Sequence, residues 1–168
     1  EISGNEIGGL EFFEPWESAI AVNSVSHTVY VTNGNAIAAF QENGEPATFT
    51  AGPGAGTSEI GGFSRLSGVA VDADGDIYAS DHSEETVKVF DESGEPLTQF
   101  AAPSPTGLAV DSGGAVYVAE TLGAVQKFTP SAFPVATSTS YIVSSAPVDP
   151  ANASAIAVDP ATDRLFVL

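Results

Sequence analysis

The sequence predicts an all-β protein. Its apolar residues occur in short runs of strand length, bounded by Asp, Gly, Ser or Pro, which favour turns. No window of ten or more residues carries apolar positions at helical spacing. The clearest succession of strands has four runs: Val69–Val71, Ile77–Ala79, Val87–Phe90 and Leu97–Phe100. We therefore expect consecutive antiparallel strands and no helix longer than one or two turns.

The same unit recurs along the chain. An Ala-Val pair marks its first strand at Ala21-Val22, Ala70-Val71, Ala109-Val110 and Ala157-Val158, with separations of 49, 39 and 48 residues. An aromatic residue marks its second strand at Tyr30, Tyr78, Tyr117 and Phe166. A repeat of about 40 to 50 residues made only of strands is typical of a β-propeller blade. The sequence thus predicts about three and a half blades of four antiparallel strands, an incomplete propeller.

One family shares this pattern. The order Gly-aliphatic-Ala-Val-Asp, a turn, aliphatic-Tyr-Val-Ala-Asp, a loop, and a strand ending in Phe-Asp resembles the NHL-repeat β-propeller over nearly all of the chain. NHL repeats commonly end the second strand with Asp and open the third with Arg. This chain has Asn33, Asp81 and Glu120 at the first position, and Ala36, Thr86 and Ala124 at the second. If the family uses these two residues as an ion pair within each blade, the resemblance implies that this chain lacks that pair.

The elements are expected within one segment, 1–168. Residues 1–18 form either an entry strand or an N-terminal arm, and the blades lie near 19–50, 67–101, 106–145 and 154–168. The first blade is expected to have its outer strand near 46–50, followed by a long surface loop at 51–67 that is rich in Gly and Pro. The outer strand of the third blade is expected within 137–143.

The fourth copy supplies only two strands, at 155–158 and 164–168. A blade with an unpaired edge and an apolar face in water is avoided in soluble proteins. We therefore expect further polypeptide, a protein partner or another copy of the chain to complete the propeller. The absence of Met agrees with a processed protein or a piece of a longer one.

Charge and composition limit the classes of partner that this chain can bind. Four Lys plus Arg against 22 Asp plus Glu give a net charge of −18, which repels nucleic acid and anionic membranes. No apolar run reaches the length of a membrane span, and no Cys is present. A composition rich in Ala, Thr, Ser and Gly but poor in Lys favours a secreted or cell-surface protein. Asn152 begins a formal glycosylation sequon.

The candidate ligand-binding residues follow the second strands. They are Asn33, Asp81, His82 and Glu120, which belong to the face that carries the second-to-third loops and the connections between blades. Sites of propellers usually use that face. His27 falls in a first-to-second turn, on the opposite face, so His27 and His82 are not expected to share a zinc ion.

Three alternate carboxylates form a candidate metal site. Asp72, Asp74 and Asp76 superficially resemble a calcium loop, but its Gly is displaced and Ser83 stands where the twelfth-position Glu is needed. A plain hairpin turn explains the same residues. No cofactor is expected, and calcium is the alternative.

Three function classes stay open. The first is a non-catalytic, extracellular or cell-surface propeller that acts as a binding or scaffolding module. The second is a propeller lyase or hydrolase whose catalytic groups lie outside this segment. The third is a structural subunit of a surface layer or filament. Fold-level analogy does not choose among them.

Overall fold

The computed structural model describes residues 19–121, 123–149, 153 and 155–168. The expected entry strand or arm at 1–18 and the sequon residue Asn152 lie outside these residues. Within them the prediction of an all-β protein is confirmed, since the only helix is one turn of 3-10 helix, η1 (Gly52–Gly54). Across the same ranges, no helix is long and apolar enough to cross a membrane.

The strands form four antiparallel sheets that follow the chain order. The first contains β1 (Ile20–Val22), β2 (Val29–Asn33), β3 (Ala36–Phe40) and β4 (Glu59–Ile60). The second contains β5 (Leu66–Val71), β6 (Ile77–Asp81), β7 (Thr86–Phe90) and β8 (Pro96–Ala101). The third contains β9 (Pro105–Val110), β10 (Val116–Glu120), β11 (Val125–Pro130) and β12 (Tyr141–Val143). The fourth has two strands, β13 (Ile156–Asp159) and β14 (Arg164–Val167). The described sheets agree with the three and a half blades that the repeats predict.

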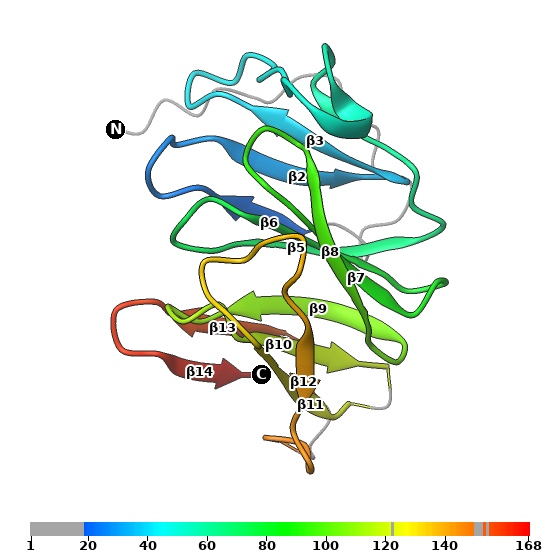
Figure 1. Ribbon diagram of the computed structural model, residues 1–168, viewed down its shortest axis with the longest axis vertical. Coiled ribbons are helices and arrows are strands. Elements are labelled where there is room, and N and C mark those ends of the chain that lie inside the picture. The colour runs from blue at the N-terminus through cyan, green and yellow to red at the C-terminus, as the bar shows by residue number, and fades with distance from the viewer. Residues whose placement is uncertain (1–18, 122, 150–152, 154) are drawn as a thin grey trace.

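The first strands of the sheets lie side by side. β5 lies between β1 and β9, and β9 also contacts β13. Figure 1 shows the first three sheets succeeding one another along the long axis of the molecule, with β13 and β14 beside the third. All four Ala-Val pairs line one small cavity of about 260 Å³. The small Ala side chains therefore allow these strands to approach one another at the centre, as the propeller prediction requires.

Among the described residues, two of the hydrophobic clusters lie between neighbouring sheets. The core between the first and second sheets contains Tyr30, Phe49, Ile60 and Phe90 among its buried side chains. The core between the second and third sheets contains Tyr78, Val89, Val116 and Phe128 among others. Tyr30 and Tyr78, which mark the second strands of their repeats, thus pack between the sheets.

The outer strand of the first sheet differs from the prediction. Residues 46–50 form no strand and contribute only the isolated β-bridge between Phe40 and Pro46, whereas Glu59 and Ile60 pair with β3. The expected surface loop 51–67 instead carries the buried side chains of Ile60, Phe63 and Leu66 into the core. The physical reason is that burying these three apolar side chains is more favourable than leaving them exposed to water in a surface loop. In the third sheet, β12 occupies only 141–143 of the expected range 137–143.

Candidate functional site

The predicted binding residues follow the second strands as expected. Asn33, Asp81 and Glu120 are the last residues of β2, β6 and β10. Asn33 donates a hydrogen bond from Nδ2 to Glu59 Oε1 at 3.2 Å, and His82 Nδ1 lies 3.0 Å from the carbonyl oxygen of Pro105. Burial raises the pKa of Glu120. These contacts give no sign of a shared ligand, and a binding role for the four residues stays a prediction.

Asp81 organises the backbone around it. Its side chain is fully buried, and Oδ2 accepts a hydrogen bond from the backbone N–H of Ser64 at 2.7 Å. Oδ1 accepts further backbone N–H donors from Arg65 at 3.0 Å and from Ser83 and Glu84 at 3.2 Å each. Burial alone raises the pKa of this carboxyl, but these donors outweigh it and hold the pKa below its ordinary value. The carboxylate therefore fixes the entry into the second sheet and the β6–β7 loop together.

The triplet of alternate carboxylates divides into two roles. Asp72 builds its own turn, because Oδ1 accepts the backbone N–H groups of Asp74 and Asp76 at 3.0 Å each, and Oδ2 accepts the Tyr78 hydroxyl at 2.8 Å. Asp111 makes the same kind of contacts in the third sheet. This is the hairpin turn that the sequence offered as an alternative to a metal site. Asp74 and Asp76 take no part in holding the turn through their side chains.

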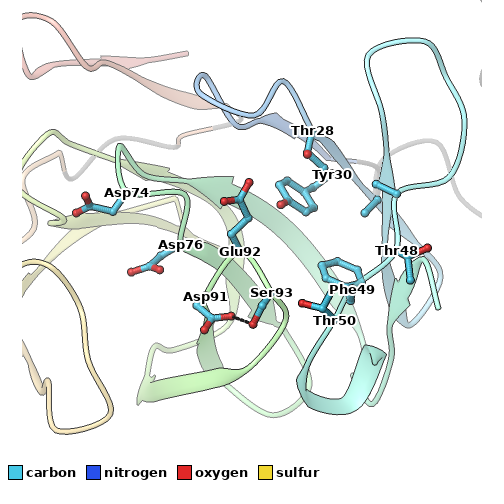
Figure 2. Close-up of a pocket in the computed structure, with 12 residues that line it drawn as sticks. Thr28, Tyr30, Thr48, Phe49, Thr50, Asp74, Asp76, Asp91, Glu92 and Ser93 are labelled. Carbon is cyan, nitrogen blue, oxygen red and sulfur yellow. Dashed lines mark hydrogen bonds between the residues drawn. The ribbon is translucent and has the colours of Figure 1, made fainter. Parts of the chain in front are cut away.

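Asp74 and Asp76 instead line a pocket between the first and second sheets. It has a volume of about 540 Å³ and lies on the face of the first-to-second turns, opposite the predicted one. We call it the acidic pocket; its lining residues are Thr28, Tyr30, Ala39, Ala47, Thr48, Phe49, Thr50, Asp74, Asp76, Asp91, Glu92 and Ser93. In Figure 2, Asp74, Asp76 and Asp91 gather on one side, the aromatic and Thr side chains lie on the other, and Glu92 lies between them.

Backbone contacts hold the two sides of the acidic pocket together. The N–H groups of Thr50 and Ala51 donate to the carbonyl oxygen of Ser93 at 3.0 and 2.9 Å. Gly52, with a positive φ of 64°, lies so near Gly94 that a side chain at position 52 would collide with the Gly94 carbonyl. The segment after β3 is thereby fixed against the β7–β8 turn, so the pocket is formed by elements that pack directly on each other.

Asp76 is the unusual member of the pocket. Only 7% of it is exposed, and its carboxylate accepts no hydrogen bond from any described residue. Burial, followed by the negative charges of Asp72, Asp74 and Asp91, raises its pKa to about 7. Among the described residues, Thr86 Oγ1 is the fully buried side-chain polar atom without a partner, so the Asp76 oxygens keep some contact with solvent at the pocket. Burying most of a carboxylate still disfavours its charged form. The fold therefore tolerates at this position a carboxylate that destabilises it.

The repeat shows that the fold does not require this carboxylate. The backbone N–H of Asp76 donates to Asp72 Oδ1, and in the third sheet the N–H of Ala115 donates to Asp111 Oδ1 at 2.9 Å. The backbone carbonyls of both residues also accept the N–H of the turn Asp, as that of Thr28 accepts the N–H of Asn23. The equivalent positions are thus Ala and Thr, so the acid at position 76 is particular to this pocket.

Asp91 and Glu92 have polar partners. Asp91 Oδ1 accepts the Ser93 hydroxyl at 2.6 Å and the backbone N–H of Glu95 at 3.0 Å. Glu92 Oε1 accepts the Asn23 amide at 3.2 Å. Burial, together with the negative charge of Glu92, raises the pKa of Tyr30 to about 12. Four carboxyl groups thus border the pocket, and no Lys or Arg is among its lining residues.

The opposite wall is aromatic and hydroxylated. The rings of Tyr30 and Phe49 are stacked, with centroids 6.2 Å apart and an interplanar angle of 22°. Thr28, Thr48 and Thr50 add hydroxyl groups around them. Among the residues that the structure describes, no three His, Asp or Glu side chains are grouped so as to hold a metal ion. The arrangement suits a ligand with a positive charge at one end and an apolar portion at the other.

Sequence reasoning did not predict most of this pocket. The turn that supplies Asp91 and Glu92 reads Asp-Glu-Ser-Gly-Glu, and its counterpart after β3 reads Gln-Glu-Asn-Gly-Glu, so both look like ordinary polar hairpin turns. The available signal was the third carboxylate of the triplet, because the equivalent turns in the other repeats have no acid there. The sequence pattern does not predict the packing of residues 47–51 against the next sheet.

Comparison with known proteins supports the fold alone. No family model matches the chain, and no curated protein matches it. Among solved structures, hydrazine synthase of Kuenenia stuttgartiensis is 16% identical with a TM-score of 0.63, and the match covers 98% of this chain and 44% of that one. A catalytically inactive virginiamycin B lyase from Staphylococcus aureus, solved with quinupristin, is 13% identical with a TM-score of 0.61, covering 91% and 50%. A protein of unknown function from Bacteroides caccae is 10% identical with a TM-score of 0.59, covering 90% and 53%.

These similarities agree with a β-propeller fold, which the sheets of this chain already indicate. The chain spans about half the length of each of these three structures. Two of them are enzymes, but identities of 13% and 16% carry no catalytic role over to particular residues of this chain.

Proposed function

We propose that this chain is a non-catalytic binding module of a secreted or cell-surface β-propeller protein, and that its acidic pocket recognises a positively charged ligand. The observation that carries the proposal is the buried Asp76 carboxylate, which lines a pocket and has no hydrogen-bond donor among the described residues. Groups with strongly perturbed pKa values in a pocket are functional-site candidates. A bound cation supplies the charge that the pocket lacks.

The charge of the whole chain supports the same ligand class. A net charge of −18 creates a negative potential around the molecule that attracts cations and repels anions. The pocket adds Asp74, Asp91 and Glu92 close to Asp76, so the local field has the same sign as the long-range one. Attraction at a distance and recognition at the pocket thus favour one kind of ligand.

Cation binding is expected to stabilise the folded chain through Asp76. At a hundredfold excess over Kd, a ligand that binds only the folded state adds about 2.7 kcal/mol, which raises the Tm by roughly 5 to 10 °C. We expect at least one member of a panel of metal and organic cations, compared with NaCl at equal ionic strength, to give such a shift by scanning fluorimetry. In Asp76→Asn the shift should disappear. A panel without any stabilising cation, or an undiminished shift in the variant, would contradict the proposal.

A second surface supports a scaffolding role. The fourth sheet has half the strands of the other three, and β14 pairs only with β13 among the described strands. Phe166 on β14 is 53% exposed. Because an open edge with exposed apolar side chains favours strand pairing, we propose that further strands, from another segment or a second copy, pair with β14. For the 17.0 kDa chain alone, light scattering should give a mass that rises with concentration. A constant mass of one chain up to millimolar concentration would argue against self-pairing.

A further inference from the structure

We propose that the acidic pocket binds an alkylammonium group, carried by a free polyamine or by a lysine side chain, with the ammonium at Asp76 and the aliphatic chain along Tyr30 and Phe49. This inference rests on the proposed function and names the ligand class of the same pocket. It rests on the two walls of the pocket, between which the carboxylate of Glu92 lies in Figure 2.

The acidic wall suits a compact cation with several donors. Asp76 has no hydrogen-bond donor among the described residues, and Asp74 and Asp91 lie on either side of it in Figure 2. An ammonium group carries three N–H donors and no acceptor, so it can satisfy Asp76 and reach a neighbouring carboxylate at the same time. A charge-assisted hydrogen bond in a partly buried site is stronger than one in water.

A metal ion fits this wall less well. Calcium takes six to eight oxygen ligands that converge on one point. Asp91 Oδ1 already accepts Ser93 and Glu95, and Asp72 is committed to its turn and to Tyr78. In the described part of the chain, no group of three acidic or His side chains is arranged for metal ligation. A single ammonium needs no such convergence.

The aromatic wall offers contacts for the aliphatic part of the ligand. The stacked rings of Tyr30 and Phe49, with Ala39 and Ala47, offer apolar contact to methylene groups. The Thr hydroxyls around them can accept a hydrogen bond from a second amine. A volume of about 540 Å³ lies within the range of small-molecule sites. A bare inorganic cation leaves this wall unused, whereas an alkylamine contacts both walls.

The experiment compares ligands of increasing chain length on the full chain. Isothermal titration calorimetry at pH 8 and constant ionic strength uses ammonium, methylammonium, butylammonium, 1,4-diaminobutane, spermidine and calcium, each as the chloride. We expect butylammonium to bind at least tenfold more tightly than ammonium, because its methylene groups add apolar contact with the pocket lining that ammonium lacks. Equal affinities for ammonium and butylammonium would overturn the role given to Tyr30 and Phe49.

Two variants and a matched control locate the site. Asp76→Asn and Asp76→Ala should each weaken butylammonium binding at least tenfold, and both should fold, since Ala115 occupies the equivalent turn position. Glu85→Gln removes the same charge from an exposed loop position on the opposite face and should leave the affinity unchanged. Circular dichroism confirms folding of each variant. Equal weakening by Glu85→Gln would reduce the effect to bulk charge and overturn the proposal.

The outcomes separate this inference from the proposed function. Asp76-dependent binding of calcium without binding of any amine would overturn the alkylammonium assignment and leave a cation-binding module. Failure of every cation would overturn both. A lysine with blocked termini, titrated beside spermidine, distinguishes the two sources of the ammonium. Preference for the blocked lysine points to a partner protein, and preference for spermidine points to a free polyamine.

A pH series adds an independent readout. The groups that face Asp76 are Asp72 and Asp74 on its own turn and Asp91 on the β7–β8 turn, and Tyr141 on β12 also senses its charge. The ligand amine stays protonated up to about pH 10. Because the ammonium favours ionised Asp76, butylammonium should bind several-fold more tightly at pH 8 than at pH 5.5. Asp76→Asn should remove most of this dependence, and an unchanged pH profile in that variant would overturn the assignment to Asp76.

Discussion

Replacing Asp81 with Ala is expected to destabilise the protein by roughly 3 to 5 kcal/mol. The carboxylate is fully buried and accepts four backbone N–H groups, those of Ser64, Arg65, Ser83 and Glu84. Removing it leaves all four N–H groups without their shared acceptor, and water can replace only part of the loss although the donor residues themselves are exposed. Urea unfolding at pH 7 measures the loss, and Glu85→Ala, at an exposed position nearby, is the control and should change stability little. A loss below 1 kcal/mol would show that the loop holds without the carboxylate.

The same carboxyl gives a pH dependence of known sign. Its pKa in the folded state is lower than the ordinary value of 3.8, so its stabilising contribution is complete above that value. The contribution is lost as the pH falls from about 4 through the folded-state pKa. Between pH 4 and pH 2, the native protein should therefore lose more stability than Asp81→Ala does. Parallel losses in the two proteins would contradict the lowered pKa.

Replacing Asp76 with Asn should act in the opposite direction and stabilise the protein at pH 8 by roughly 2 to 4 kcal/mol. The folded-state pKa of Asp76 is raised from 3.8 to about 7, and one pKa unit corresponds to about 1.4 kcal/mol. A neutral amide avoids both the burial of a charge and the repulsion from Asp72, Asp74 and Asp91. Functional groups often destabilise the folded protein, so replacing one commonly increases stability.

The pH dependence of this effect follows from the raised pKa. Well below pH 3.8, Asp76 is protonated in the folded and the unfolded chain, so the carboxyl imposes no penalty. Between about pH 4 and 7, the unfolded chain ionises first, and the penalty grows with pH until it is complete above 7. The advantage of Asp76→Asn in urea unfolding should grow over the same window. A constant advantage from pH 4 to pH 8 would refute the raised pKa.

Much of the fold could be predicted because the repeat encodes it locally. Ala70-Val71, Tyr78 and the turn residue Asp72 recur at fixed offsets, and each has the same task in its sheet: central strand, core between sheets, and turn. The predicted position of the outer strand in the first sheet was wrong. Phe49 and Ile60 are both apolar and both buried, so the pattern alone does not decide which of them continues the sheet.

The candidate site was less predictable for a related reason. Asp76 and Asp91 lie in two separate hairpin turns, and the segment that contains Phe49 belongs to another sheet. Their proximity depends on how one sheet packs on the next, which no local spacing records. Asp81 shows that a residue predicted to bind a ligand can have a structural role. A polar residue at the end of a strand indicated a binding role, yet its burial and its four backbone donors are properties of the tertiary structure.

The central claim is that Asp76 is a buried carboxylate prepared for a cation, and its own titration tests this most directly. Carbon-13 NMR of the Asp side-chain carboxyls, with Asp76→Asn to assign the resonance, follows its ionisation in the free protein and with saturating butylammonium. We expect a pKa of about 7 in the free protein and a clear decrease in the complex, because the ammonium stabilises the ionised form. An ordinary pKa near 4 in the free protein, or the same pKa with and without the amine, would contradict the account.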